Sequence, residues 1–139
     1  MVENFNNIYT LVLFIFACIF TPGFYAAVQL WETKKVLARY NIDESAALIA
    51  RFAACWPTAE ATVAFLILIF GPSGNWAFFV FGIVVFGAST IYNTLSYFDI
   101  AMTYGRGKYK VSPEAMYASV FKLLSYSLLT YSLSDKIFL

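Results

Sequence analysis

The chain of 139 residues contains no histidine, and this absence removes several kinds of chemistry at once. Without imidazole it cannot by itself form a bis-histidine haem site, a histidine-rich metal site or a catalytic triad that uses histidine as the base. Its two cysteines, Cys18 and Cys55, both lie in apolar stretches, so we interpret them as small apolar residues and not as a redox pair. A glycine-rich phosphate loop is also missing. We therefore expect a protein that is not an enzyme and that carries no metal or cofactor.

Charged residues are also scarce, at 12% of the chain, and the formal net charge is only +1. So few basic residues give no footprint for nucleic acid, and nothing indicates a soluble small-molecule substrate. Hydrophobic residues make up 61% of the chain, and the mean hydropathy is +0.72. A soluble domain of this length would be far more polar. The composition therefore predicts an integral membrane protein.

Apolar stretches long enough to cross a bilayer alternate with short polar breaks, which predicts one all-α domain made of four transmembrane helices. The predicted spans are residues 8–31, 46–70, 76–104 and 114–133. A Gly-Pro turn at 71–75 leaves room only for an antiparallel connection, and Ser112-Pro113-Glu114 is a typical helix start. Pro22 and Pro57 fall inside spans, where each frees a backbone carbonyl that a neighbouring group must satisfy.

The basic residues predict the orientation of the bundle, because Lys and Arg are enriched in loops on the cytoplasmic side. Apart from Arg51, Lys122 and Lys136, they lie in the connections after spans one and three: Lys34, Lys35, Arg39, Arg106, Lys108 and Lys110. We expect these two loops to face the cytoplasm or the matrix and both termini to lie on the opposite side. The same six residues are candidates for contact with phospholipid headgroups.

A charge at membrane depth costs several kcal/mol unless it finds a partner, so the charges inside the spans mark the candidate site. Arg51 and Asp99 each lie five residues inside their spans from the basic side, ~7 to 8 Å deep, and we expect them to pair. Lys122, ~12 Å deep, can lean back toward that level.

Glu60 lies deeper, at ~21 Å, beyond easy reach of the basic loops. We expect its carboxyl group to bind the nearest polar groups of the third span, Thr90 and Asn93, or a group of a neighbouring subunit. Nine residues separate Glu60 from Arg51, which places the two side chains on nearly opposite helix faces. They are therefore not predicted to pair with each other.

The sequence Ala50-Arg51 followed by Trp56, at the start of the second span and after Glu32-Thr33-Lys34-Lys35, resembles the Erg28 family of small four-span scaffold proteins. Only Arg51 and Trp56 match the family's motif. The family's Thr-Phe-Gly after that arginine is replaced by Phe52-Ala53-Ala54, and its His and Glu of the third helix are absent. The resemblance implies a non-catalytic tether that holds other membrane proteins together.

Two functions remain open. The first is a structural or accessory subunit or scaffold of a larger membrane complex, for example a respiratory-chain or ATP-synthase assembly of the mitochondrial inner membrane, or an Erg28-like tether of the endoplasmic reticulum. Its partners would be other integral membrane subunits and phospholipids. The second is a small four-helix transporter that uses Glu60 as a proton-coupling carboxyl group.

Overall fold

The computed structural model describes residues 2–98, 100 and 113–139, and all regular structure in these residues is helical. The prediction of an all-α fold is confirmed. In chain order the elements are η1 (Val2–Phe5), α1 (Ile8–Phe14), η2 (Ile15–Phe20), α2 (Thr21–Trp31), α3 (Thr33–Arg39), η3 (Glu44–Ala46), α4 (Ala47–Ala53), α5 (Cys55–Phe70), α6 (Trp76–Tyr97), α7 (Glu114–Ser132) and α8 (Ser134–Ile137).

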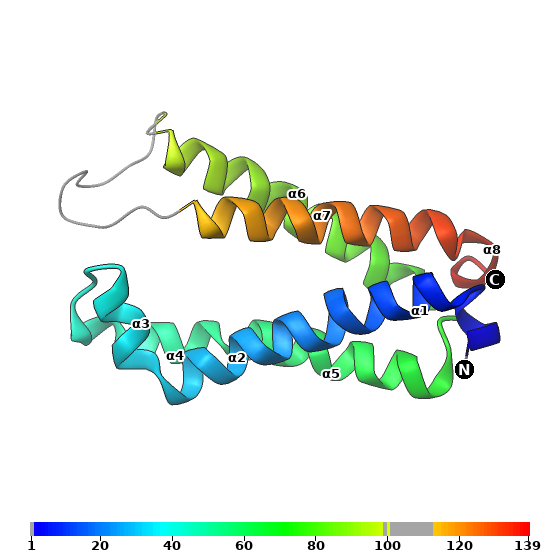
Figure 1. The fold of residues 1–139 in the computed structure, drawn as a ribbon, viewed down its shortest axis with the longest axis horizontal. Helices are drawn as coiled ribbons and strands as arrows, with labels where there is room; N and C mark the ends of the chain where they lie inside the picture. Colours follow the sequence, from blue (N-terminus) through cyan, green and yellow to red (C-terminus); the bar gives the residue numbers. More distant parts are fainter. Residues whose placement is uncertain (1, 99, 101–112) are drawn as a thin grey trace.

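The helices associate in two pairs (Figure 1). In the continuous rod of α1, η2 and α2, the η2 and α2 parts pack along α5 and the α1 part contacts α7, whereas α6 packs along α7. The turn at 71–75 joins α5 to α6, with Gly71 and Gly74 at positive φ of 95° and 71°, a region that glycine adopts without steric cost. Although they are consecutive, α5 and α6 thus belong to different pairs and diverge from their shared turn.

Both ends of the described chain lie at the same end of the bundle as this turn (Figure 1). There the Nδ2 atom of Asn6 donates to the Ser132 carbonyl at 2.7 Å and to the Asp135 carboxylate at 2.8 Å. At the opposite end, Arg39 and Tyr40 contact Glu114 at 2.5 and 2.9 Å. Polar contacts thus join the two helix pairs at both ends of the bundle.

Among the described residues, three helices are long and apolar enough to cross a membrane: Ile8–Trp31, Glu44–Phe70 and Trp76–Tyr97. They correspond to the first three predicted spans. Helix α6 ends at Tyr97, and the predicted continuation to residue 104 lies almost wholly outside the described residues. The fourth predicted span forms a helix of 19 residues, α7, but α7 is more polar than the other three and is not among them.

The core is small and aromatic, and it lies where the two helix pairs meet. Phe5, Phe14 and Phe79 are fully buried and form a chain of rings with centroids 4.8 and 6.1 Å apart. Most of the apolar surface points outward, because only 33%, 17% and 11% of the most apolar windows of the three candidate spans is buried within the chain. A surface of this kind suits lipid or other membrane helices.

Candidate functional site

The first feature of the site is a backbone carbonyl that a proline leaves without its donor. Within η2, a π-helix, the backbone N–H of Thr21 donates to the carbonyl of Phe16, five residues back, and the Thr21 hydroxyl donates to the same oxygen at 2.8 Å. In the same spacing the carbonyl of Ala17 would accept from residue 22. This residue is Pro22, which has no backbone N–H. The carbonyl of Ala17, a fully buried residue, is therefore left without its backbone donor.

Lys122 of α7 supplies the missing donor. Its Nζ atom donates to the Ala17 carbonyl at 2.5 Å and forms an ion pair with Oε1 of Glu60, from α5. The two side chains are only 6% and 11% exposed. One ammonium group thus joins η2, α5 and α7, and the carbonyl freed by Pro22 finds the neighbouring group that the sequence requires.

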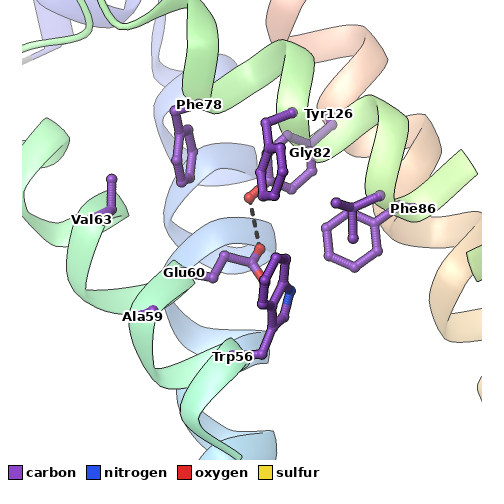
Figure 2. A pocket seen from close by; sticks show the side chains of 10 residues that line it. Trp56, Ala59, Glu60, Val63, Phe78, Gly82, Phe86 and Tyr126 are labelled. Carbon is purple, nitrogen blue, oxygen red and sulfur yellow. Dashed lines mark hydrogen bonds between the residues drawn. The ribbon is translucent and has the colours of Figure 1, made fainter. Parts of the chain in front are cut away.

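Tyr126 completes the cluster one helical turn after Lys122. Its hydroxyl donates to Oε1 of Glu60 at 2.7 Å (Figure 2). The ring passes against the backbone of α6 at Gly82, where an added Cβ would lie only 2.1 Å from the Tyr126 ring. Glycine is therefore required at this position for the tyrosine to reach the carboxylate. We refer to Glu60, Lys122 and Tyr126 as the Glu60 cluster.

The charges of the Glu60 cluster are compensated by other groups of the same chain. The Lys122 ammonium lies 4.8 Å from the ring centroid of Phe86 and 5.3 Å from that of Tyr126, within the range of cation–π attraction. Together with the Glu60 carboxylate, these rings surround the cation with favourable partners. The cluster can therefore hold a largely buried lysine and a largely buried glutamate without a second subunit.

A pocket of about 270 Å³ lies beside the cluster, between α5 and α6 (Figure 2). Glu60 is the charged side chain in its wall, and the rings of Trp56 and Phe81 contact each other at its edge, with centroids 5.5 Å apart. The lining residues are Trp56, Ala59, Glu60, Val63, Phe78, Phe81, Gly82, Val85, Phe86 and Tyr126.

The expected partners of Glu60 were wrong. Thr90 donates to the carbonyl of Phe86 in its own helix at 2.7 Å, and Asn93 donates to the Ala115 carbonyl at 3.2 Å and to the Ser119 hydroxyl at 3.4 Å. Asn93 therefore joins α6 to α7 and does not serve Glu60. Tyr126 was not predicted as a partner of Glu60, although its depth from the start of α7, ~18 Å, is close to that of Glu60.

The expected direction of Lys122 was also wrong, because its side chain joins the deeper Glu60 and not the level of Arg51. Arg51 donates through Nε to the Thr33 hydroxyl at 3.2 Å, and that hydroxyl donates to the Gln29 carbonyl at 2.5 Å. Asp99 lies outside the described residues, and with it the predicted Arg51–Asp99 pair.

Three of the six loop cations have carboxylate partners near the end of the bundle opposite the termini. Lys34 pairs with Glu44 at 3.0 Å, Lys35 with Glu32 at 2.7 Å and Arg39 with Glu114 at 2.5 Å. All six of these side chains are at least half exposed. The other three loop cations, Arg106, Lys108 and Lys110, lie outside the described residues.

No family model, curated protein or solved structure matches this chain. The interpretation of the site therefore rests on its own chemistry. The Glu60 cluster presents a carboxylate, an ammonium and a phenol, and in the described part of the chain no three His, Cys, Asp or Glu residues gather as metal ligands would. The arrangement can neutralise charge and accept a hydrogen bond, which are the properties of a structural or binding site.

Proposed function

We propose that the protein is a non-catalytic accessory subunit or scaffold of a multi-subunit membrane complex. The observation that carries the proposal is the outward apolar surface: between two thirds and nine tenths of each candidate span's most apolar window is not buried within the chain. Leu48 and Phe52, one turn apart on α4, are 79% and 77% exposed. Contiguous apolar surface of this extent suits contact with other membrane helices as well as lipid.

The proposal includes α7 as a fourth transmembrane helix. Its 19 residues are long enough to cross a bilayer, and its greater polarity comes partly from Lys122, whose charge Glu60 neutralises. With four spans, the basic loops after the first and third spans would face the cytoplasm or the matrix, and both termini the other side.

Lys122 neutralises the charge of Glu60 within the chain, so no partner has to bring a charge into the membrane. This fits a subunit whose apolar faces contact other membrane subunits and phospholipids. The mitochondrial inner membrane is the proposed location, with the endoplasmic reticulum as the alternative that an Erg28-like tether would require.

Native electrophoresis in mild detergent, followed by mass spectrometry of the excised band, tests the proposal. We expect the chain to migrate with a constant set of larger membrane proteins. Leu48→Ser with Phe52→Ser should reduce this association, whereas Ser45→Ala should not, because this exposed residue lies outside the apolar face. Migration of the unaltered chain as a monomer or homodimer alone would contradict the subunit proposal.

A proton-coupled transporter is the second candidate, and one observation favours it: Glu60, a protonatable group, lines a pocket at membrane depth. The test is proton-driven uptake by the chain reconstituted into vesicles with an imposed pH gradient. A transporter would lose this uptake in Glu60→Gln. Uptake that persists unchanged in Glu60→Gln would exclude proton coupling at Glu60.

A further inference from the structure

We propose that the pocket between α5 and α6 binds a neutral lipid that carries one free hydroxyl group, of the long-chain alcohol class. The hydroxyl would donate to Oε2 of Glu60, and the hydrocarbon chain would leave over the open rim beside Val63 and Phe81. This inference goes beyond the proposed function and does not depend on it, because the pocket is formed by this chain alone.

The shape of the pocket fits the polar end of a lipid and not a whole lipid. Its volume of about 270 Å³ lies just below the 300–1,000 Å³ typical of small-molecule sites. Its rim is open, since Trp56, Val63 and Phe81 are 52%, 42% and 54% exposed. Both walls belong to candidate membrane spans, so the mouth lies at the depth of the acyl chains.

The charges of the Glu60 cluster select the kind of head group. Among the described residues, both contacts of the Glu60 carboxylate fall on Oε1, one from Lys122 and one from Tyr126. The second oxygen, Oε2, remains as an acceptor at the pocket wall, where Trp56 lies on the side of the carboxyl group away from Tyr126 (Figure 2). A donor in the pocket would complete the hydrogen bonding of a carboxylate that is largely removed from water.

Ionic head groups fit less well. A cationic head would compete with Lys122, which already holds the carboxylate and the faces of Phe86 and Tyr126. An anionic head would meet Glu60 itself, at a depth where like charges repel strongly. A neutral hydroxyl group brings a donor without a charge, and the remaining lining is apolar or aromatic, which suits a hydrocarbon chain.

Quenching of Trp56 fluorescence by brominated lipids tests this proposal. In the Trp31→Phe/Trp76→Phe background, Trp56 is the only tryptophan of the chain. The protein is placed in phosphatidylcholine nanodiscs with small mole fractions of 9,10-dibromostearyl alcohol, its methyl ether or 9,10-dibromostearic acid. We expect saturable quenching by the alcohol, and a half-saturating mole fraction about tenfold or more higher for the ether, which has no donor, and for the ionised acid.

Two variants that fill the pocket locate the binding site. Ala59→Leu fills it from α5 and Val85→Phe from α6, and each should raise the half-saturating mole fraction of the alcohol by about tenfold. The matched control Ala53→Leu, at an exposed position outside the pocket, should leave it unchanged. Equal quenching by all three lipids, tighter binding of the acid, or quenching that neither pocket variant changes would overturn the proposal.

Discussion

The same ion pair, lysine with glutamate, occurs in two different settings of this molecule. In the pair Lys34–Glu44, near the end of the bundle opposite the termini, the side chains are 76% and 69% exposed, whereas those of Lys122 and Glu60 are 6% and 11% exposed. Exposed pairs contribute about 0.2–1 kcal/mol, because water and salt screen them. Breaking a buried pair costs about 3–5 kcal/mol, mainly because one charge is left without a partner.

The comparison shows what the buried pair does for the fold. Replacing both of its members by apolar residues is often neutral or stabilising, so its presence is weak evidence for stability as such. It does fix an arrangement: Lys122 is satisfied only where η2 and α5 both present an acceptor. The exposed pair imposes no such condition, and each of its side chains can turn to water instead.

The largest expected effect comes from Lys122→Met, which leaves the Ala17 carbonyl without its donor and the Glu60 carboxylate without its counter-ion. We expect a loss of about 3–5 kcal/mol in the free energy of unfolding, measured by denaturant titration in detergent micelles. Lys34→Met is the matched control and should cost under about 1 kcal/mol. Equal losses in the two variants would show that burial does not change how much such an ion pair contributes to stability.

The double variant Glu60→Leu/Lys122→Met sharpens the same comparison. Because both charges are then absent, it should recover much of the stability that Lys122→Met loses. Strictly additive losses would contradict a coupling between the two side chains.

A smaller effect is expected at Gly82, on which the reach of Tyr126 into the cluster depends. In Gly82→Ala the new methyl group would lie 2.1 Å from the Tyr126 ring, and such overpacking costs about 1–3 kcal/mol. The control Gly87→Ala places its methyl group 3.8 Å from Leu123, an ordinary contact, and should be neutral or stabilising because Ala favours helix more than Gly. Thermal unfolding of both variants measures the two effects. A result in which Gly87→Ala is destabilised and Gly82→Ala is not would contradict this expectation.

At the exposed end, Glu114→Gln should change stability by only about 0.2–1 kcal/mol, and the change should shrink at 1 M salt. The same variant should also change the pKa of Tyr40. Burial, and then the hydrogen bond to Glu114, raise the pKa of Tyr40, so this pKa should fall toward its ordinary value in the variant. Carbon NMR of the labelled phenol rings measures it, and an unchanged Tyr40 titration would contradict the contact.

The smallest effect concerns Asp43, a fully exposed residue whose side chain caps η3 by accepting from the backbone N–H of Ser45 at 2.8 Å. Hydrogen bonds from the Ser45 side chain and backbone lower the pKa of Asp43. The cap is therefore fully present above the ordinary aspartate pKa and is lost as pH falls through the lowered value. Protection of the Ser45 amide from hydrogen exchange should fall in that acidic range, but show no such step in Asp43→Asn.

Much of the fold follows from local sequence signals. The Gly-Pro turn at 71–75 and the capping residue Asp43 stop or start helices through backbone geometry that no distant contact is needed to define. The pairing of helices is different, because α5 and α6 both carry many apolar side chains that stay exposed, so the apolar pattern does not select one neighbour. The packing of α7 against α6 depends on close contacts between distant residues, such as that of the Tyr126 ring with Gly82.

The site was predictable in part. Glu60 and Lys122 stand out as charges within apolar helices, and Pro22 indicates that a freed carbonyl needs a donor. Their joining was missed because depth was counted from helix ends at a fixed rise, which ignores the length of a lysine side chain and the direction in which it finds acceptors. Snorkelling toward water was expected, but two buried acceptors lie the other way.

The cluster also bears on how such a protein is made. The three most apolar helices precede α7 in the chain, so during synthesis they leave the ribosome first. A lysine entering the bilayer by itself is costly, but Lys122 arrives after Glu60 and the bare carbonyl of Ala17 have been made. If α7 is the fourth span, the earlier helices act as a receptor for the last one, and a nascent chain halted before residue 122 would hold Glu60 without its counter-ion.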